Sequence, residues 1–420
     1  MEIELDYSKK TVAELITICK EKKIKGYSDK KKNEIIKLIL EPIQEPIQKP
    51  IQKPIQVNKI VKIVKKQNKS IITDNVVDKI IVQPQINITA VNQETNNIDT
   101  GKLKMIDLCA GTGAFSMAFT QTGNVDVIFA NDMVESSKII YDDNFNHKLF
   151  LKDLNKVNVL DIPKHDILTA GFSCQPFSIA GKQKGFQDNR SDIFWKLFEI
   201  IEHHKPQCFI FENVKNLLSH DDKKTFKIIL DNIAKYGYNV KYKVLNTSEI
   251  TGIPQNRERV YIIGIKSKEV YDKFNLDFPN KDKKKITQML ETNTIPDKYY
   301  YTNKSSTWTL LSTNVTEKDK VYQYRRVYVR ENKSDECPTL TANMGTGGHN
   351  VPIILDDTGI RKLTPRECFN FQGFPSSYKL PKTLSDASLY KLAGNAVSVP
   401  VVSLIADKLV PLLLQNKNIS

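Results

Sequence analysis

Four polar side chains in the middle of the sequence have the types that covalent catalysis requires. Cys174 lies in the segment Gly-Phe-Ser-Cys-Gln-Pro-Phe-Ser, just after an apolar run that is expected to be a strand. Glu212 ends the next such run, and Arg257 and Arg259 precede another. A thiolate attacks an electron-poor carbon, and a neighbouring acid and cation stabilise the charge that develops. A lone cysteine is more often a small buried hydrophobe, so this interpretation requires a fold that brings the four side chains together.

A second group of small and acidic residues favours a nucleoside-type cofactor. Gly111 and Gly113 lie between a predicted strand and a predicted helix, where small residues let the backbone approach a ligand. Asp132 ends the following predicted strand, at a spacing that suits an acceptor for ribose hydroxyls. The third glycine of the dinucleotide fingerprint is missing, so S-adenosylmethionine is favoured over a nicotinamide dinucleotide. Asp153 is a candidate acceptor for the adenine amino group, although a surface aspartate is the simpler interpretation.

The elements expected to position these residues are the strands and helices of an α/β domain. Short apolar runs alternate with helical segments from Lys102 onward, as in a parallel sheet flanked by helices. Open α/β sheets bind ligands at the carboxyl ends of their strands, and the candidate residues lie close to such ends. The expected strands are 103–109, 125–130, 166–170, 208–212, 240–245 and 260–265.

The first hundred residues differ in composition from the rest. Apolar spacing predicts two short helices between Thr11 and Leu40, with Ser28 or Asp29 as the cap of the second. Residues 1–40 resemble the small helical DNA-binding module called the SAP domain, and a solvated charged hairpin stays the alternative. A four-residue Pro-Ile-Gln repeat and a basic stretch predict a disordered linker over 41–101, because such closely spaced prolines are incompatible with helix interiors.

Charge and cysteine content narrow the class of protein. The 420-residue chain has a formal net charge of +14, which favours nucleic acid as a partner, although an AT-rich genome would also enrich lysine. Its six cysteines include no pair at zinc-site or redox spacing, so no metal and a reducing compartment are expected. His203 and His204, near Cys208, are interpreted as a helix end. No signal peptide or membrane span is predicted, so the protein is expected to be intracellular and soluble.

From Lys102 onward the motifs resemble, in type and order, those of the DNA (cytosine-5)-methyltransferase family. The motifs above are followed by Arg-Lys-Leu-Thr-Pro-Arg-Glu-Cys from Arg361, Gln-Gly-Phe-Pro from Gln372 and Gly-Asn-Ala-Val from Gly394. The resemblance implies a Rossmann-like, S-adenosylmethionine-dependent catalytic lobe over 102–274, a target-recognition lobe over 275–380, and a C-terminal segment, 381–420, that returns to the catalytic lobe. Cys109 departs from the family's usual phenylalanine without removing a catalytic group.

The reaction that fits these residues is methylation of cytosine at carbon 5. That carbon is a poor nucleophile until a thiolate, here of Cys174, adds to carbon 6 of a base flipped out of double-stranded DNA. A protonated Glu212 and the Arg259 cation would stabilise the charge on ring nitrogen 3 and the carbonyl oxygen. The expected catalytic residues are Cys174, Glu212, Arg257 and Arg259; the expected cofactor residues are Asp107, Cys109, Gly111, Thr112, Gly113, Asp132, Met133, Asp153, Leu154, Asn395 and Val397; the expected DNA contacts are Gln175, Ser178, Thr339 and Leu340.

The alternatives differ in substrate and in activity. An amino-group methyltransferase would need an Asp/Asn-Pro-Pro-aromatic motif, which the chain lacks. The tRNA branch of the same family has nearly the same motifs, but the long segment 266–357 and the N-terminal module favour DNA. A catalytically silent DNA-binding homologue need not retain Cys174 or Glu212. A monomer is expected, a partner restriction endonuclease is an open alternative, and no code converts the sequence into a recognition site.

Overall fold

The computed structural model describes residues 11–21, 32, 39, 101–172, 192–325, 327–345 and 351–417. The chain divides into two units, Met1–Asn87 and Ile88–Ser420. In the first unit, α1 (Val12–Glu21) confirms the first predicted helix. Its Leu15 and Cys19 form a small buried cluster with Ile39. The rest of the second predicted helix, with its cap, and the linker over 41–100 lie outside the described residues.

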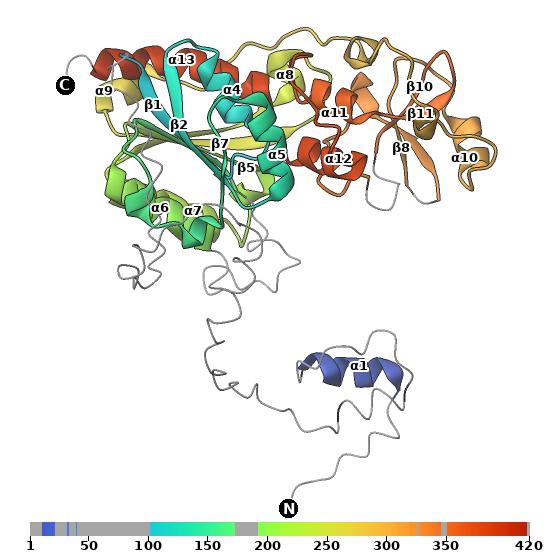
Figure 1. The fold of residues 1–420 in the computed structure, drawn as a ribbon, viewed down its shortest axis with the longest axis horizontal. Helices are drawn as coiled ribbons and strands as arrows, with labels where there is room; N and C mark the ends of the chain where they lie inside the picture. The colour runs from blue at the N-terminus through green and yellow to red at the C-terminus, as the bar shows by residue number, and fades with distance from the viewer. Residues whose placement is uncertain are drawn as a thin grey trace, which may run out of the picture. The chain divides into compact units, whose positions relative to one another are not determined.

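The second unit is built on a seven-stranded sheet with the order β3-β2-β1-β4-β5-β7-β6 (Figure 1). The predicted α/β class is confirmed, but the expectation of a parallel sheet is wrong at β7, which runs antiparallel to both β5 and β6. Residues 247–257 join β6 to β7, and α8 (Thr247–Thr251) within them is a helix of only five residues. The strands are β1 (Leu103–Leu108), β2 (Val125–Asp132), β3 (Phe150–Leu151), β4 (Ile167–Gly171), β5 (Cys208–Val214), β6 (Asn239–Asn246) and β7 (Glu258–Ile265).

Helices cover both faces of this sheet because its strands are apolar on both sides. In β1, Met105 joins one core cluster and the adjacent Ile106 joins the other, as expected for a strand buried on both faces. Helices α4, α8, α9 and α13 contribute to the first cluster, and α6 and α7 to the second (Figure 1). The helices of this lobe are α4 (Ala114–Thr120), α5 (Glu135–Asn144), α6 (Asp192–His204), α7 (Lys224–Lys235), α8 (Thr247–Thr251), α9 (Lys268–Lys273) and α13 (Val399–Lys417).

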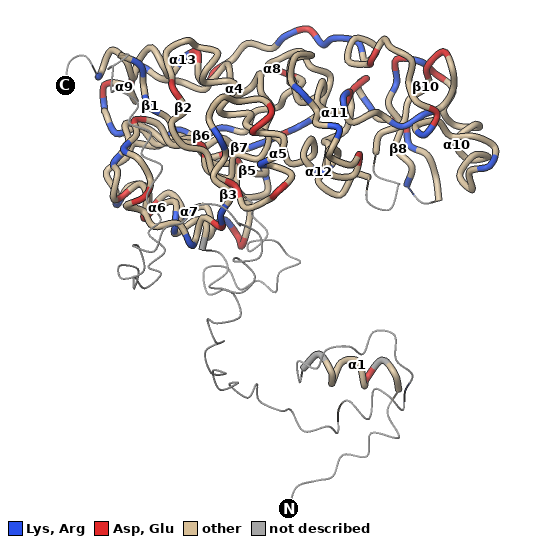
Figure 2. Tube along the Cα trace, viewed as in Figure 1, with Lys and Arg blue, Asp and Glu red and all other residues tan. Residues whose placement is uncertain are grey.

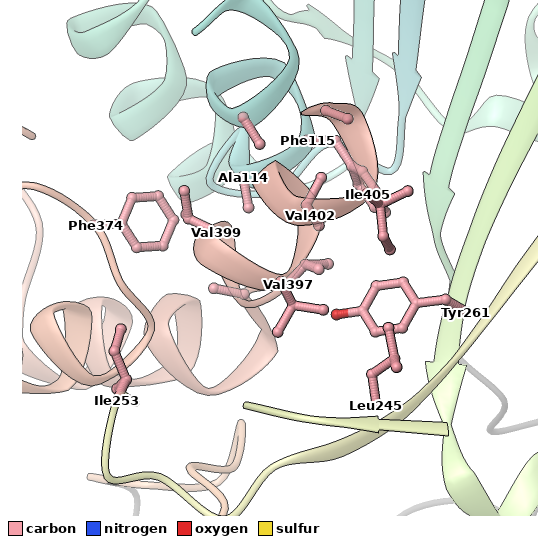
Figure 3. Close-up of a cluster of buried hydrophobic side chains, with 14 of the residues drawn as sticks. Ala114, Phe115, Leu245, Ile253, Tyr261, Phe374, Val397, Val399, Val402 and Ile405 are labelled. Atoms are coloured by element: carbon pink, nitrogen blue, oxygen red, sulfur yellow. The ribbon is translucent and has the colours of Figure 1, made fainter. Parts of the chain in front are cut away.

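The C-terminal helix α13 fills the centre of the first cluster. Its Val402 and Ile405 pack between Phe115 of α4 and Tyr261 of β7 (Figure 3). The stretch Asp386–Lys417 is long and apolar enough to cross a membrane by length and composition alone. Val402 and Ile405 are fully buried, however, so the apolar side of α13 is accounted for by the protein core. Helix α13 thus packs against α4 and β7, and the bounds expected for the C-terminal segment, 381–420, stay a prediction.

A smaller sheet, β11-β10-β8-β9, lies within the range expected for target recognition. Its strands are β8 (Tyr322–Tyr324), β9 (Val329–Glu331), β10 (Ile353–Leu355) and β11 (Ile360–Lys362). Leu311 of α10 (Trp308–Asn314) packs with Tyr322, Ile353 and Ile360 beneath this sheet. Helices α11 (Pro365–Phe371) and α12 (Asp386–Asn395) follow. Short 3-10 helices are η2 (Leu154–Lys156), η3 (Val159–Asp161), η6 (Lys215–Leu218), η7 (Ile286–Met289), η8 (Asp297–Tyr299) and η9 (Lys333–Asp335).

Candidate active site

The segment between β1 and α4 forms a tight loop with left-handed backbone. Cys109, Gly111 and Gly113 have φ angles of 53°, 54° and 73°. A Cβ atom at position 113 would lie 2.4 Å from the Phe145 ring and 2.8 Å from the Tyr141 ring. Glycine is therefore required at this position by backbone conformation and by the close approach of two aromatic rings.

We expect Gly113→Ala to destabilise the fold by about 2–5 kcal/mol, from about 1–2 for left-handed backbone and about 1–3 for overpacking. The matched control is Gly123→Ala, because Gly123 has a similar φ of 76° but no atom within 4 Å of its added Cβ. The control should lose only about 1–2 kcal/mol in a urea unfolding titration. Equal losses in the two variants would contradict the packing argument.

Asp132, at the end of β2, supports the loop from the neighbouring strand. Its Oδ2 accepts a hydrogen bond of 2.9 Å from the Gly111 amide, and its Oδ1 accepts one of 2.9 Å from the Val134 amide. Burial raises the pKa of the carboxyl group, and these amide hydrogen bonds oppose the shift. Hydrogen bonds from the Met133 backbone and the Ser137 side chain also lower this pKa, so the carboxylate is an acceptor shared by the loop and the start of α5.

Asp107 lies beneath this loop and is fully buried. Its carboxylate accepts hydrogen bonds from the amide and hydroxyl of Ser116, at 3.1 and 2.7 Å, and from the hydroxyl of Thr169, at 2.9 Å. Burial raises the pKa of Asp107 to about 6. The expectation of a direct cofactor contact by this side chain is corrected to a supporting role, because its oxygens are inaccessible and join β1, β4 and α4. Ser116 and Thr169 belong to no recognised motif, so their hydrogen bonds to Asp107 could not be predicted from the sequence.

The other expected cofactor residues lie in varied surroundings. Thr112 is buried, and its carbonyl accepts a hydrogen bond of 2.8 Å from the Tyr378 hydroxyl. Met133 is 64% exposed, whereas Leu154 is buried. Asp153 caps η2 by accepting from the Asn155 amide at 3.1 Å, as a structural aspartate does. Cys109 is half-buried, and burial raises the pKa of its thiol to about 12. Of the remaining expected cofactor residues, Asn395 is exposed and Val397 is buried.

Glu212 and Arg259 form an ion pair at the junction of β5 and β7. The Arg259 Nε lies 3.1 Å from Glu212 Oε1, and the two side chains are only 15% and 10% exposed. Glu212 is in register with Gly171, the last residue of β4. A Cβ on Gly171 would lie 3.7 Å from Glu212 Oε2 and 3.3 Å from Val397 Cγ2. The structure therefore brings an expected catalytic pair and an expected cofactor residue to the end of β4.

The segment that contains Cys174 follows directly from this point. The Asn213 side-chain amide donates a hydrogen bond of 3.0 Å to the Phe172 carbonyl, which fixes the chain just beyond β4. Cys174, Gln175 and Ser178 lie outside the described residues. Gly171 and Phe172, the last described residues before Cys174, are therefore held against β5 beside Glu212.

Arg257 has a different environment from Arg259. Its guanidinium is buried and donates to the carbonyls of Leu340, Ala396 and Gly394, at 3.0, 2.7 and 3.2 Å. Burial lowers the pKa of Arg257 to about 9, and the charge of Arg259 adds to that effect. The expected catalytic role is corrected, because both terminal nitrogens hold backbone from two distant segments. Arg257 lies just before β7, whose first residue is Glu258. The alternation of side chains along a strand therefore does not predict whether the Arg257 side chain points the same way as that of Arg259.

Two of the expected DNA contacts, Thr339 and Leu340, are among the described residues, and both form hydrogen bonds with the segment around Arg257. Leu340 is buried, with its amide donating to Gln255 Oε1 at 3.3 Å and its carbonyl bound to Arg257. The half-buried Thr339 hydroxyl donates to the Asn256 carbonyl at 2.6 Å. A DNA contact by the Leu340 side chain is therefore corrected to a packing role, because that side chain has almost no exposed surface.

Arg361 and Glu367 form a buried pair whose role the sequence analysis missed. The guanidinium donates to both oxygens of Glu367, each at 2.7 Å. The Thr364 hydroxyl caps α11 and the Glu367 carboxylate accepts from the Thr364 amide, which completes a capping box. The spacing Thr-x-x-Glu is the sequence pattern from which this capping box could have been predicted. The pair links β11 of the smaller sheet to α11.

Within the described ranges, no group of three or more histidine, cysteine or acidic residues is arranged to hold a metal ion. His203 and His204 end α6, as the sequence predicted. The His204 ring nitrogen Nε2 lies 3.1 Å from the Val159 carbonyl. These histidines are therefore accounted for by helix termination and packing.

Comparison with known proteins gives one extensive and one short family match. Residues 103–411 match the model described as C-5 cytosine-specific DNA methylase, and residues 6–44 match the Rho termination factor, N-terminal domain. The short match covers the segment expected to resemble a SAP module, and that resemblance stays a prediction.

Relatives and solved structures each match about three quarters of the chain. The chain is 46% identical to Type II methyltransferase M.Bsp6I of Bacillus sp. (strain RFL6), covering 73% of this chain and 98% of that protein. It is 37% identical to Type II methyltransferase M.HaeII of Haemophilus aegyptius, covering 73% and 92%. The S. pombe Dnmt2 methyltransferase structure is 22% identical with a TM-score of 0.58, covering 74% and 99%. The Entamoeba histolytica methyltransferase EhMeth is 20% identical with a TM-score of 0.61, covering 75% and 99%. The structural likeness shows the shared fold.

Proposed function

The chain belongs to the C-5 cytosine-specific DNA methylase family, and on that premise we propose how its own residues methylate carbon 5 of cytosine in DNA. The enzyme class is DNA (cytosine-5-)-methyltransferase, EC 2.1.1.37. The observation that carries the proposal is the Glu212–Arg259 ion pair beside Gly171, where the Cys174 segment begins. Arg259 engages Oε1 and leaves Oε2 directed toward the end of β4.

The proposed reaction begins with Cys174 as the nucleophile. Its thiolate adds to carbon 6 of a flipped cytosine, and the electrons of the carbon 5–carbon 6 double bond become available at carbon 5. Glu212 donates a hydrogen bond and a proton to ring nitrogen 3, while Arg259 orients that carboxyl group. Transfer of the methyl group to carbon 5 would leave S-adenosylhomocysteine. Water would then take the carbon-5 proton, the electrons of that bond would restore the double bond and expel the thiolate of Cys174, and ring nitrogen 3 would return its proton to Glu212.

S-adenosylmethionine is the proposed methyl donor, and when bound it supplies an electrophilic methyl group. The chain offers a suitable cradle, because Gly111 and Gly113 leave room for close approach and the Asp132 carboxylate, an acceptor for ribose hydroxyls, lies against the same loop. Val397 lies beside Gly171 at the end of β4, as Glu212 does. We include as further contacts Cys109, Thr112, Met133, Asp153, Leu154 and Asn395.

Asp132→Ala is expected to weaken binding of S-adenosylmethionine by about 1.5–3 kcal/mol, the typical contribution of a hydrogen bond to a charged group. Isothermal titration calorimetry measures the loss directly. The control is Asp126→Ala on the same strand, because Asp126 forms a 3.2 Å surface ion pair with Lys102. Such pairs contribute about 0–1 kcal/mol to stability, and this one should leave cofactor affinity unchanged. Equal affinities in all three proteins would remove Asp132 from the site.

For the rest of the chain, we propose that residues 275–380 recognise the target sequence in double-stranded DNA. Residues 1–40 and the basic linker over 41–101 would add affinity that depends on salt. Residues 102–274 would form the catalytic lobe, completed by 381–420. The relatives are named Type II methyltransferases, which supports a role in restriction-modification beside a partner endonuclease. We propose an intracellular, monomeric enzyme.

Bisulfite sequencing of DNA from cells that express the protein tests this function. Protected cytosines in one short sequence context are the expected result, because the modification, the base and the context are read together. A parallel assay with purified tRNA and labelled S-adenosylmethionine tests the substrate. If the enzyme labelled tRNA, and bisulfite sequencing found no methylated cytosine in genomic DNA, the assignment of DNA as the substrate would be overturned.

A further inference from the structure

The hairpin of β8 and β9 has two different faces. Tyr322 and Tyr324 pack into the cluster beneath the smaller sheet. Gln323 lies between them in the strand and is in register with Arg330 of β9. Successive side chains of a strand alternate between faces, so Gln323 and Arg330 occupy the face opposite to the tyrosines. Figure 2 shows basic positions on this part of the smaller sheet.

On this outer face the polar groups are arranged as hydrogen-bond donors. Gln323 Oε1 accepts from Nη2 of Arg325 at 2.9 Å and from Nη2 of Arg330 at 2.6 Å. The single acceptor of the glutamine side chain is thereby engaged, and its amide NH2 remains. Guanidinium groups have only donors. Nη2 of Arg330 also donates to Asn332 Oδ1 at 3.4 Å. Arg325 and Arg330 are exposed, and among the described residues neither forms an ion pair with a carboxylate, so Nε and Nη1 of both side chains are left as donors for a ligand.

Two large apolar side chains are exposed near the tip of the hairpin. Val327 is 83% exposed and Tyr328 is 51% exposed, which makes them unusual among the large hydrophobic residues described. The Arg325 amide donates to the Tyr328 carbonyl at 2.8 Å, and this bond closes the turn. The closed turn holds Val327 and Tyr328 close to Arg325.

We propose that the β8–β9 hairpin enters the major groove of the recognition sequence and that Arg325 and Arg330 recognise guanine there. The major groove admits a two-stranded β-ribbon. Guanine presents two acceptors, O6 and N7, to a donor-only surface, whereas the amino groups of cytosine and adenine present donors that such a surface repels. Val327 and Tyr328 would contact thymine methyl groups or sugars. The inference rests on the proposed function and adds to it the residues that set specificity.

The test compares methylated sequence contexts for the parent enzyme, Arg325→Lys and Arg330→Lys. Lysine keeps the charge but loses the planar fork that binds two acceptors. Bisulfite sequencing of one randomised DNA library should show that at least one variant loses about 5- to 150-fold discrimination for guanine at one position of the context. Gln323→Ala, which frees both guanidiniums without removing charge, should lower the same discrimination.

Lys333→Ala is the matched control, because Lys333 is exposed in η9 of the same lobe. It should leave the methylated context unchanged. An unchanged context in both arginine variants, with or without a uniform fall in rate, would overturn the proposal, because contacts to phosphate alone weaken all sequences alike. Measurements of thermal unfolding and of cofactor binding identify a variant that fails to fold. If an arginine variant fails to fold, the methylated context of Gln323→Ala tests the proposal in its place. Absence of any cytosine-5 methylation by the parent enzyme would refute the proposed function instead.

Discussion

Cys174→Ser should abolish methylation of DNA, with a rate lower by at least about 10⁴-fold, as expected when a covalent nucleophile is removed. A serine hydroxyl has a far higher pKa than a thiol, so almost none of it is ionised at neutral pH. The substituted side chain keeps nearly the same size. Folding and cofactor binding should therefore be close to those of the parent enzyme, which assigns the loss to chemistry.

The covalent step can be observed directly with DNA that contains 5-fluorocytosine. The step that removes the carbon-5 proton is then blocked, so the adduct should survive denaturing electrophoresis with the parent enzyme and be missing with Cys174→Ser. Cys19→Ser is the control, because Cys19 lies in α1 of the other unit and is expected to play no part in the reaction. Trapping and methylation by Cys174→Ser near the parent rate would exclude the proposed cytosine-5 mechanism.

Sequence patterns predicted most of the central sheet because each strand is a short apolar run with its own local signal. The direction of β7 was not predictable in the same way, because it depends on how the chain returns after β6. Strand identity is local information, whereas strand direction follows from the length of a connection and the packing of distant elements. The same distinction applies to the smaller sheet, whose strands are too short for a clear periodic pattern.

The candidate site shows a similar division. The spacing of the motifs predicted that Glu212 and Arg259 would meet, and the structure places them in contact. Arg257, only two residues away, instead binds carbonyls from residues 340, 394 and 396. Asp107 likewise lies in a cofactor motif but supports it from below. Residue type and spacing identify the motif, but burial and hydrogen-bond partners separate the groups that face a ligand from those that hold the site in shape.

Glu212→Gln tests the second group at the reaction centre. Glutamine keeps the shape of the side chain, and its carbonyl oxygen can accept from Arg259 Nε, which lies 3.1 Å from Oε1 in the parent. The amide then presents a donor to ring nitrogen 3 but cannot transfer a proton. We expect adduct formation to slow by about 10²–10⁴-fold, the usual contribution of general acid catalysis, with DNA binding retained.

Glu258→Gln makes the same substitution at a neighbouring position outside the centre. Glu258 is 42% exposed and pairs with Lys215 at 2.8 Å, so its charge is largely solvated and its loss should change the rate little. Single-turnover kinetics with DNA that contains 5-fluorocytosine measure the rate of adduct formation separately from DNA binding. If both glutamine variants formed the adduct at the parent rate, stabilisation of ring nitrogen 3 would have to come from another group. A slow Glu212→Gln beside a normal Glu258→Gln would assign proton donation to the carboxyl group that Arg259 holds.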